Sequence, residues 1–239
     1  MRVPAAPSRR SVVRMTVRFL ALSTEAHDPA ALAAFWAALL GRDTAPDGTT
    51  VLSDDPGQVV LRFEQSPAEI VEHNWIHLHL TCQTPEEQDA VVARALSLGA
   101  SHLDVGQRPE EGHVVLADPE GNAFCVLEPA NGFTAGCGFL GELACDGTRE
   151  VGLFWSAALG WPLNWDQDEE TSIQHPQHGG TKISWGGPPV NAKQGRNLRF
   201  ELEADDEDVV RLVTLGATRL GDDLLTDPDG NEFRVTRPA

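Results

Sequence analysis

The feature that most constrains this sequence is an internal repeat. Three short motifs occur twice, in the same order: FWAALLG at 35–41 and FWSAALG at 154–160, LGAS at 98–101 and LGAT at 215–218, ADPEGNAF at 117–124 and TDPDGNEF at 226–233. Motifs that return in a fixed order indicate a duplicated structural unit. The chain of 239 residues is therefore predicted to fold as two copies of one domain, at residues 15–131 and 137–239.

Each copy has the pattern of two strand–helix–strand units. In the first copy, residues 17–23 are predicted to form a strand, and Asp28 followed by Pro29 begins a helix that ends at Gly41. The further elements predicted there are strands 59–64 and 75–82, a helix from the capping box at Thr84 to Gly99, and hairpin strands 113–117 and 122–127 around a turn at 118–121. Those of the second copy are helices at 150–159 and from Asp205, strands 181–185 and 197–203, and a hairpin at 227–230. The pattern predicts an α+β fold.

Net charge and cysteine usage indicate which classes of partner and which cell compartment to expect. The formal net charge is −18. Such an acidic surface repels nucleic acid and anionic lipid and mildly favours cationic ligands, so we expect neither nucleic-acid nor membrane partners. The four cysteines form no C-x-x-C pair, which favours a reducing, cytoplasmic location.

Residues 1–14 are predicted to be a disordered extension. The segment SRRSVVR at 8–14 weakly resembles a twin-arginine export signal. A signal would continue with a longer apolar stretch, whereas here Arg18 interrupts a predicted strand. Met15 is an alternative start of the protein.

The motifs, taken in order, resemble the glyoxalase-like branch of the vicinal-oxygen-chelate superfamily, which includes the glyoxalase/bleomycin-resistance proteins. The resemblance rests on the D-P before FWAALLG, on LGA, and on DPEGNAFCVL, and it covers residues 17 to about 128 and about 139 to 236. It implies that each domain has two βαβββ units with curved sheets around a cavity and helices outside. It also implies paired domains, so we expect a monomer with an internal pseudo-dimer or a weak homodimer.

The resemblance also implies four inward strand positions that hold a divalent metal in the metal-dependent enzymes. Those positions are at about Ala21, Arg62, His77 and Cys125 in the first copy, and at about Leu140, Ser184, Arg199 and Arg234 in the second. Only His77 is a good ligand, and Arg62 would repel a cation. We therefore expect no metal and no other cofactor. His77 and His79, on one face of their strand, are the one pair that could hold an ion.

Strand alternation sorts the candidate site residues by face. With Leu78 and Leu80 packed against helices, the histidines between them face inward. The predicted lining of the first cavity is Arg62, Glu64, His77, His79, Thr81 and Cys125. His77 and His79 are candidate acid–base residues, and Cys125 is either a nucleophile or a small buried core residue. Arg62, Glu64 and Thr81 are candidate ligand-binding residues, Arg62 for a carboxylate.

The second copy offers a different inner face. Its predicted members are Ser184, Arg199, Glu201, Glu232 and Arg234. Opposite charges there are expected to pair with each other, which would make this half structural. The histidines of HPQHGG at 175–180 are interpreted as part of a hairpin loop rather than as metal ligands.

Three functions remain open at this point. The first is a metal-free protein that binds a small organic molecule. The second is a lyase- or isomerase-type enzyme that uses His77 as acid or base, with a metal-dependent form less favoured. The third is a regulatory or structural module without a ligand.

Overall fold

The computed structural model describes residues 17–69, 74–187 and 198–238, and the extension predicted at 1–14 lies outside these residues. The first half of the chain contains β1 (Arg18–Ala26), α1 (Pro29–Leu40), β2 (Thr50–Val51), β3 (Leu61–Gln65), β4 (Ile76–Leu80), α2 (Pro85–Ser97), β5 (Ser101–His102), η1 (Pro109–Glu111), β6 (Val114–Ala117) and β7 (Ala123–Val126). The second half contains β8 (Leu140–Asp146), α3 (Arg149–Leu159), β9 (Leu163–Gln167), β10 (Glu170–His175), β11 (Gly179–Gly186), β12 (Leu198–Glu203), α4 (Asp206–Leu215), β13 (Thr218–Arg219), β14 (Leu224–Thr226) and β15 (Glu232–Thr236). The predicted α+β fold with repeated units is confirmed.

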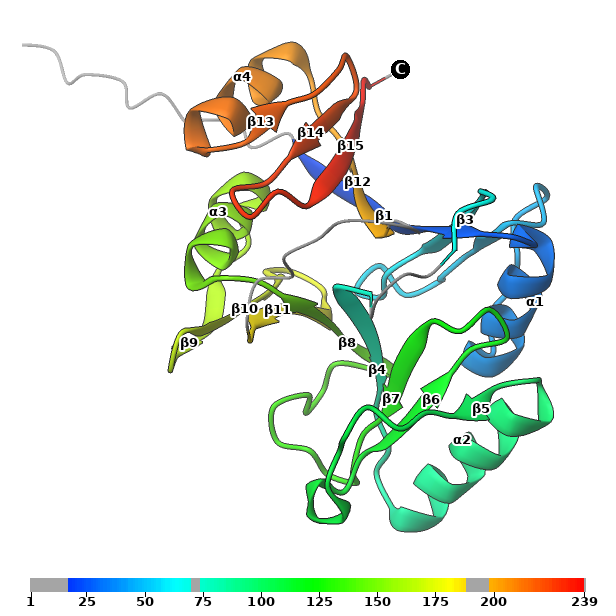
Figure 1. The fold of residues 1–239 in the computed structure, drawn as a ribbon. Helices are drawn as coiled ribbons and strands as arrows, with labels where there is room; N and C mark the ends of the chain where they lie inside the picture. The colour runs from blue at the N-terminus through cyan, green and yellow to red at the C-terminus, as the bar shows by residue number, and fades with distance from the viewer. Residues whose placement is uncertain (1–16, 70–73, 188–197, 239) are drawn as a thin grey trace, which may run out of the picture.

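The strands form two sheets, and each sheet takes strands from both halves of the chain (Figure 1). Sheet I has seven strands in the order β13-β14-β15-β12-β1-β3-β2, and sheet II has eight in the order β5-β6-β7-β4-β8-β11-β10-β9. The halves meet in antiparallel pairs, β1 with β12 in sheet I and β4 with β8 in sheet II. The two units of one half therefore belong to different sheets.

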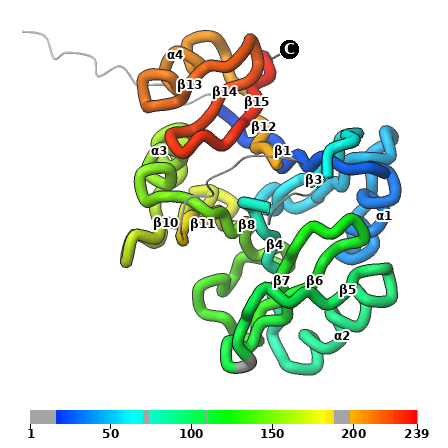
Figure 2. The backbone as a smooth tube through the Cα atoms, viewed as in Figure 1, coloured from blue at the N-terminus to red at the C-terminus, as the bar shows by residue number. Residues whose placement is uncertain are grey.

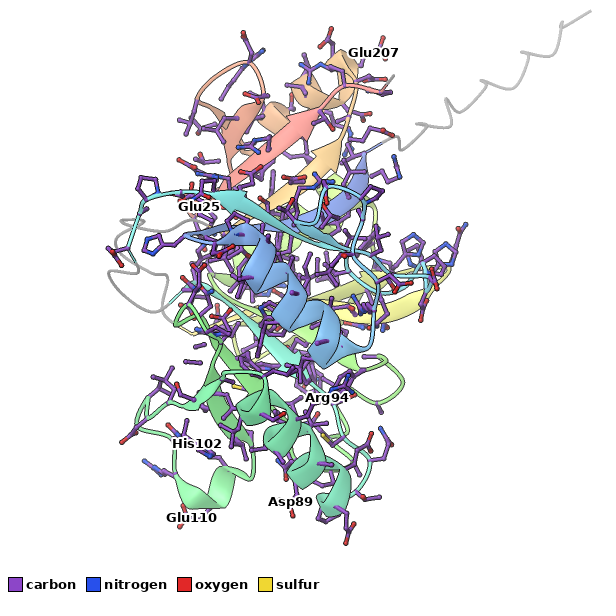
Figure 3. All side chains as sticks on the ribbon, turned by 90° about the vertical axis from the view of Figure 1, so that its right-hand side faces the viewer. Glu25, Asp89, Arg94, His102, Glu110 and Glu207 are labelled. Atoms are coloured by element: carbon purple, nitrogen blue, oxygen red, sulfur yellow. The ribbon has the colours of Figure 1, made fainter. Side chains whose placement is uncertain are left out.

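The core of the first half lies between its two units. Asp28 caps α1 by accepting a hydrogen bond from the Ala31 backbone N–H, and Gly41 ends the helix at a left-handed φ of 67°. Trp36 packs edge-on against Phe124 of β7, with ring centroids 5.0 Å apart, and α1 also packs on β3. Figure 3 looks onto this side of the molecule, with α1 between the strands of sheet I and helix α2. The helix thus joins a strand of sheet I to a strand of sheet II.

The second half repeats this arrangement with α3. Trp155 packs edge-on against Phe200 of β12 and Phe233 of β15, at centroid distances of 5.0 and 5.1 Å. The same helix contacts β10 and β11 of sheet II. Each half is therefore held together by its helices, while the two sheets hold the halves to each other.

The repeated D-P-x-G-N turn links each helix to the closing hairpin of its half. Asp118 accepts a hydrogen bond from the Trp36 indole at 3.2 Å, and Asp227 accepts one from the Trp155 indole at 3.1 Å. Burial raises the pKa of both carboxyls above the usual value, against the opposing effect of these hydrogen bonds and those of the following asparagine. The acidic third residue of each turn holds the N-cap residue of the first helix of its half. Glu120 accepts from the backbone N–H of Asp28 at 2.7 Å, and Asp229 accepts from that of Thr148 at 2.7 Å. In both halves the motif therefore ties the first helix to the closing hairpin by hydrogen bonds, and we call it the D-P-x-G-N clip.

The loop between β7 and β8 lies over the inner face of sheet II. Figure 2 traces the backbone from β7 through residues 127–139 and back to β8 beside β4. Gln58 fixes this loop by donating to the Cys137 carbonyl at 2.7 Å.

Within the described part of the chain, no helix has the length and apolarity needed to cross a membrane.

Candidate ligand-binding site

Polar side chains form a row across the four central strands of sheet II. Cross-strand pairing places Cys125 of β7 opposite His79 of β4, His79 opposite Glu142 of β8, and Glu142 opposite Lys182 of β11. The residues on either side of these positions, such as Leu78, Leu143 and Ile183, are buried in the helix-side core. Because side chains alternate along a strand, the row faces the opposite, concave side of the sheet. A second row on the same face contains His77, Ala144 and Ser184.

A cavity of about 770 Å³ lies on this face. Its polar lining includes His77, Glu142, Asn164, Lys182 and Ser184. Phe133, from the loop between β7 and β8, and Trp165 of β9 supply two aromatic rings to the lining, packed edge to face with centroids 5.9 Å apart. Trp165 is 37% exposed, an unusual exposure for a residue of this size. The cavity combines an aromatic wall with a polar floor, as small-molecule sites commonly do.

His79, which is half-buried, and Glu142, which is buried, form an ion pair beside this cavity. His79 Nδ1 lies 2.8 Å from Glu142 Oε2, and Ser184 donates a hydrogen bond to the other carboxylate oxygen. Burial would lower the pKa of His79, but hydrogen bonds with Cys125 and Glu142, and their charges, raise it to about 10. Burial would raise the pKa of Glu142, but His79, Ser184 and Lys182 hold it below its usual value. His79 therefore keeps its proton at neutral pH, which suits it poorly as a general base.

Lys182 brings a positive charge to the floor of the cavity, in addition to the protonated His79 beside it. Its ammonium donates a hydrogen bond to the Phe133 carbonyl and lies 4.4 Å from the centroid of the Phe133 ring. Such a cation–π contact fixes the ring and the loop that carries it. Lys182 thus connects the polar row to the aromatic wall.

The structure does not bring the six predicted lining residues together. His77, His79 and Cys125 lie on sheet II, and Thr81 follows β4 and donates to the Gly138 carbonyl at 2.8 Å. Arg62 and Glu64 lie on β3 of sheet I. The expectation that all six residues line one cavity is corrected for Arg62 and Glu64, because the two units of one half contribute to different sheets. A role of Arg62 and Glu64 in the same cavity as His77 does not fit this arrangement.

The concave face of sheet I is occupied by an ion-pair network that joins the two halves. Its members are Glu25, Arg62, Glu64, Arg199, Glu201, Glu232 and Arg234. Arg199 binds Glu25 at 3.0 Å and Glu232 at 2.9 Å, whereas Arg234 binds Glu64 at 2.6 Å. Arg62 pairs with Glu201, whose side chain is only 3% exposed. The charges predicted to pair within the second copy do pair, but largely with residues of the first.

Glu142, Lys182, Phe133 and Trp165 were not among the site residues predicted from the sequence. Glu142 had a usable signal, because Leu143 and Cys145 are buried and the residues before and after Leu143 must then face inward. Counting from helix landmarks gave Leu140 instead, which lies two residues before Glu142 on the same strand. Phe133 lies in a loop and Trp165 on an outer strand, where alternation gives no information.

The donor set on sheet II does not fit a divalent metal. Nδ1 of His79 lies 2.8 Å from Glu142, and with its pKa raised to about 10 the ring keeps both protons at neutral pH and offers no lone pair to a metal. Glu142 already has two cationic neighbours in His79 and Lys182. Within residues 17–69, 74–187 and 198–238, no group of three or more His, Cys, Asp or Glu side chains is arranged to hold a metal ion.

A second hollow, of about 630 Å³, lies where the start of β1 meets the turn between β10 and β11. His175 and His178 stack there with ring centroids 4.5 Å apart. His175 Nδ1 accepts hydrogen bonds from the backbone N–H groups of Gln177 and His178, so this ring is used to build the turn. The hairpin interpretation of HPQHGG agrees with the pairing of β10 and β11.

The sequence profile of the glyoxalase-like domain family matches the chain twice, over residues 21–127 and 142–236. The chain belongs to this family. The two matches cover both repeats, which confirms the resemblance to the glyoxalase/bleomycin-resistance proteins of the vicinal-oxygen-chelate superfamily. No curated protein sequence matches the chain.

Solved structures of other glyoxalase-like proteins share the fold. Glyoxalase I from Zea mays is 14% identical, with a TM-score of 0.64 and 92% of each chain covered. A single-residue variant of that enzyme gives a TM-score of 0.62 at 13% identity, covering 92% of this chain and 94% of the variant. At such identities the likeness establishes the architecture of tandem glyoxalase-like domains, and the chemistry has to be argued from the residues of this chain.

Proposed function

We propose that this glyoxalase-like protein binds a flat small organic molecule, without a divalent metal, in the cavity of sheet II. The observation that carries the proposal is the pair of rings, Phe133 and Trp165, over a polar floor in a cavity of about 770 Å³. A volume of this size suits a small organic ligand. An exposed tryptophan in such a position favours stacking against an aromatic ligand.

The charges of the lining favour a neutral or cationic ligand. Among the described lining residues, three carboxylates, Glu142, Asp146 and Glu170, stand against the one ammonium of Lys182, and the protonated His79 beside the cavity offsets only one of them, Glu142. The ammonium is also directed at the Phe133 carbonyl and ring. The net charge of −18 adds a long-range attraction for cations.

Three probes with the same ring and different charge test this proposal: 2-naphthamidine, 2-naphthamide and 2-naphthoate. We expect affinity to fall in that order in isothermal titration, and the order to weaken as salt screens the charges. Added EDTA or Ni²⁺ should leave the affinity for the amidine unchanged. Equal affinity for all three probes would contradict the charge argument, and tighter binding of the naphthoate would make Lys182 the dominant group.

The Trp165→Ala variant tests whether the bound probe lies against the Trp165 ring. Loss of an aromatic contact worth about 1 kcal/mol should weaken 2-naphthamidine binding by roughly fivefold. Val210→Ala is the matched control, because Val210 is 67% exposed on α4 and does not line the cavity. If both variants bind like the original protein, the ligand does not lie against Trp165.

A further inference from the structure

Cys125, His79 and Glu142 lie side by side on β7, β4 and β8. Phe124 and Val126, on either side of Cys125 in the sequence, are fully buried, so the thiol faces the concave side of sheet II. Cys125 is partly exposed, whereas Cys82, Cys137 and Cys145 are buried. All four cysteines of the chain are within the described residues, and Cys125 is thus the one that a reagent can reach directly.

The positions of these three residues give them the order nucleophile, proton donor and orienting carboxylate. Glu142 lies 2.8 Å from Nδ1 of His79, and strand pairing places Cys125 directly opposite His79 on its other side. Ser184 holds the second oxygen of Glu142, which fixes the direction of the carboxylate. A cysteine beside a histidine that is oriented by a third polar group is the arrangement by which proteins make a reactive thiolate.

We propose that Cys125, His79 and Glu142 form a nucleophilic triad that captures α,β-unsaturated carbonyl compounds entering the cavity of sheet II. The proposal rests on the proposed function, since it names the reactive class of ligand for that cavity. Glu142 already lines the cavity, and Cys125 is two strands away on the same face. In this triad Cys125 is the reacting group, and Glu142 is a positioning residue.

The chemistry balances with the groups present. Cys125 gives its thiol proton to solvent, and the sulfur attacks the β-carbon. A C–S bond forms while the C=C π electrons move to give an enolate. The protonated His79 gives its proton to the enolate, which leaves a thioether, and the imidazole then takes a proton back from solvent. The elevated pKa of His79, about 10, means that the proton needed for this step is present on the ring at neutral pH. Addition needs no oxidant, reductant or second substrate.

The test measures covalent labelling by acrylamide, an α,β-unsaturated amide, at pH 7, with the four cysteines followed separately by peptide mass mapping. We expect Cys125 to be labelled first. His79→Asn should slow this labelling by about a hundredfold, because it removes the acid–base partner. Glu142→Gln should slow it by roughly tenfold and Glu142→Asp by less, because aspartate restores the charge beside His79. His102→Asn, an exposed histidine on β5, is the control and should label at the original rate.

The three buried cysteines report on folding in the same experiment. A variant that merely unfolds exposes all four thiols and accelerates labelling of Cys82, Cys137 and Cys145, whereas loss of the triad slows Cys125 alone. Labelling of Cys125 at an unchanged rate in His79→Asn would overturn the triad, as would faster labelling of another cysteine in the folded protein. Fast labelling of Cys125 in a protein that does not bind the naphthyl probes would uphold the triad and refute the proposed function.

Discussion

Sheet I and sheet II are built from equivalent units, yet their concave faces differ. Both join one unit from each half through an antiparallel strand pair, and both halves have the same helix and the same D-P-x-G-N clip. Sheet I fills its concave face with ion pairs such as Arg199 with Glu25 and Glu232. Sheet II retains a cavity of about 770 Å³ beside its row of polar groups. The repeated scaffold and the concave face therefore vary independently.

The largest expected effect concerns the ion pairs of sheet I. Arg199 is 11% exposed, so Arg199→Leu leaves partly buried carboxylates without their partner and should lower the free energy of unfolding by about 3–5 kcal/mol. Arg18→Leu is the control on the same sheet, because Arg18 is 64% exposed in its pair with Glu203 and should cost less than about 1 kcal/mol. Urea denaturation measures both. Equal costs would show that the network does not stabilise sheet I.

The ion pair of sheet II should show a distinctive pH dependence. The pKa of His79 is raised from its ordinary value of 6.5 to about 10 in the folded protein. Its contribution to stability is therefore fully present below about pH 6.5 and is lost as the pH rises through about 10. His79→Asn should cost about 2 kcal/mol at pH 6, and this difference should shrink toward pH 10. Urea denaturation at pH 6, 8 and 10 measures it, with His102→Asn as baseline. A difference that is constant with pH would contradict a charged His79.

The clips should behave alike in the two halves. Trp36→Phe removes the indole donor to Asp118, and Trp155→Phe removes the one to Asp227. Each change should cost about 1–2 kcal/mol, because a buried acceptor loses its hydrogen bond. Thermal denaturation of the two variants side by side checks this equality. A clear difference would mean that the scaffold has diverged along with the concave faces.

Much of the scaffold could be predicted from local sequence. The helix that begins at Asp28 and ends at Gly41 was recognisable from its caps, and the clips from their turn residues. The pairing of β1 with β12 and β4 with β8 could not be, because alternation along a strand shows which face is buried and not which strand lies beside it. Outer strands were also missed: Asn164–Gln167 in β9 is largely exposed and lacks an apolar alternation.

The candidate site was predicted only in part, because the sequence does not show which strands lie side by side. His77, His79 and Cys125 belong to one strand pair of the first half, and their common face followed from sequence alone. Their partners Glu142, Lys182 and Ser184 come from the other half and required the strand order. Arg62 and Glu64 were assigned to the wrong neighbours because they lie in the other sheet.

The claim that sheet II holds the ligand and sheet I does not is tested most directly by ¹⁹F NMR of protein labelled with 5-fluorotryptophan. The chain has six tryptophans, and each resonance is assigned by its Trp→Phe variant. Trp165 lines the cavity, Trp75 packs on Phe200 of β12 in sheet I, and Trp161 lines the second hollow. On titration with 2-naphthamidine we predict a saturable shift that is largest for Trp165, with Trp75 and Trp161 unmoved. A saturable shift of Trp75 or Trp161 while Trp165 stays in place would contradict the account.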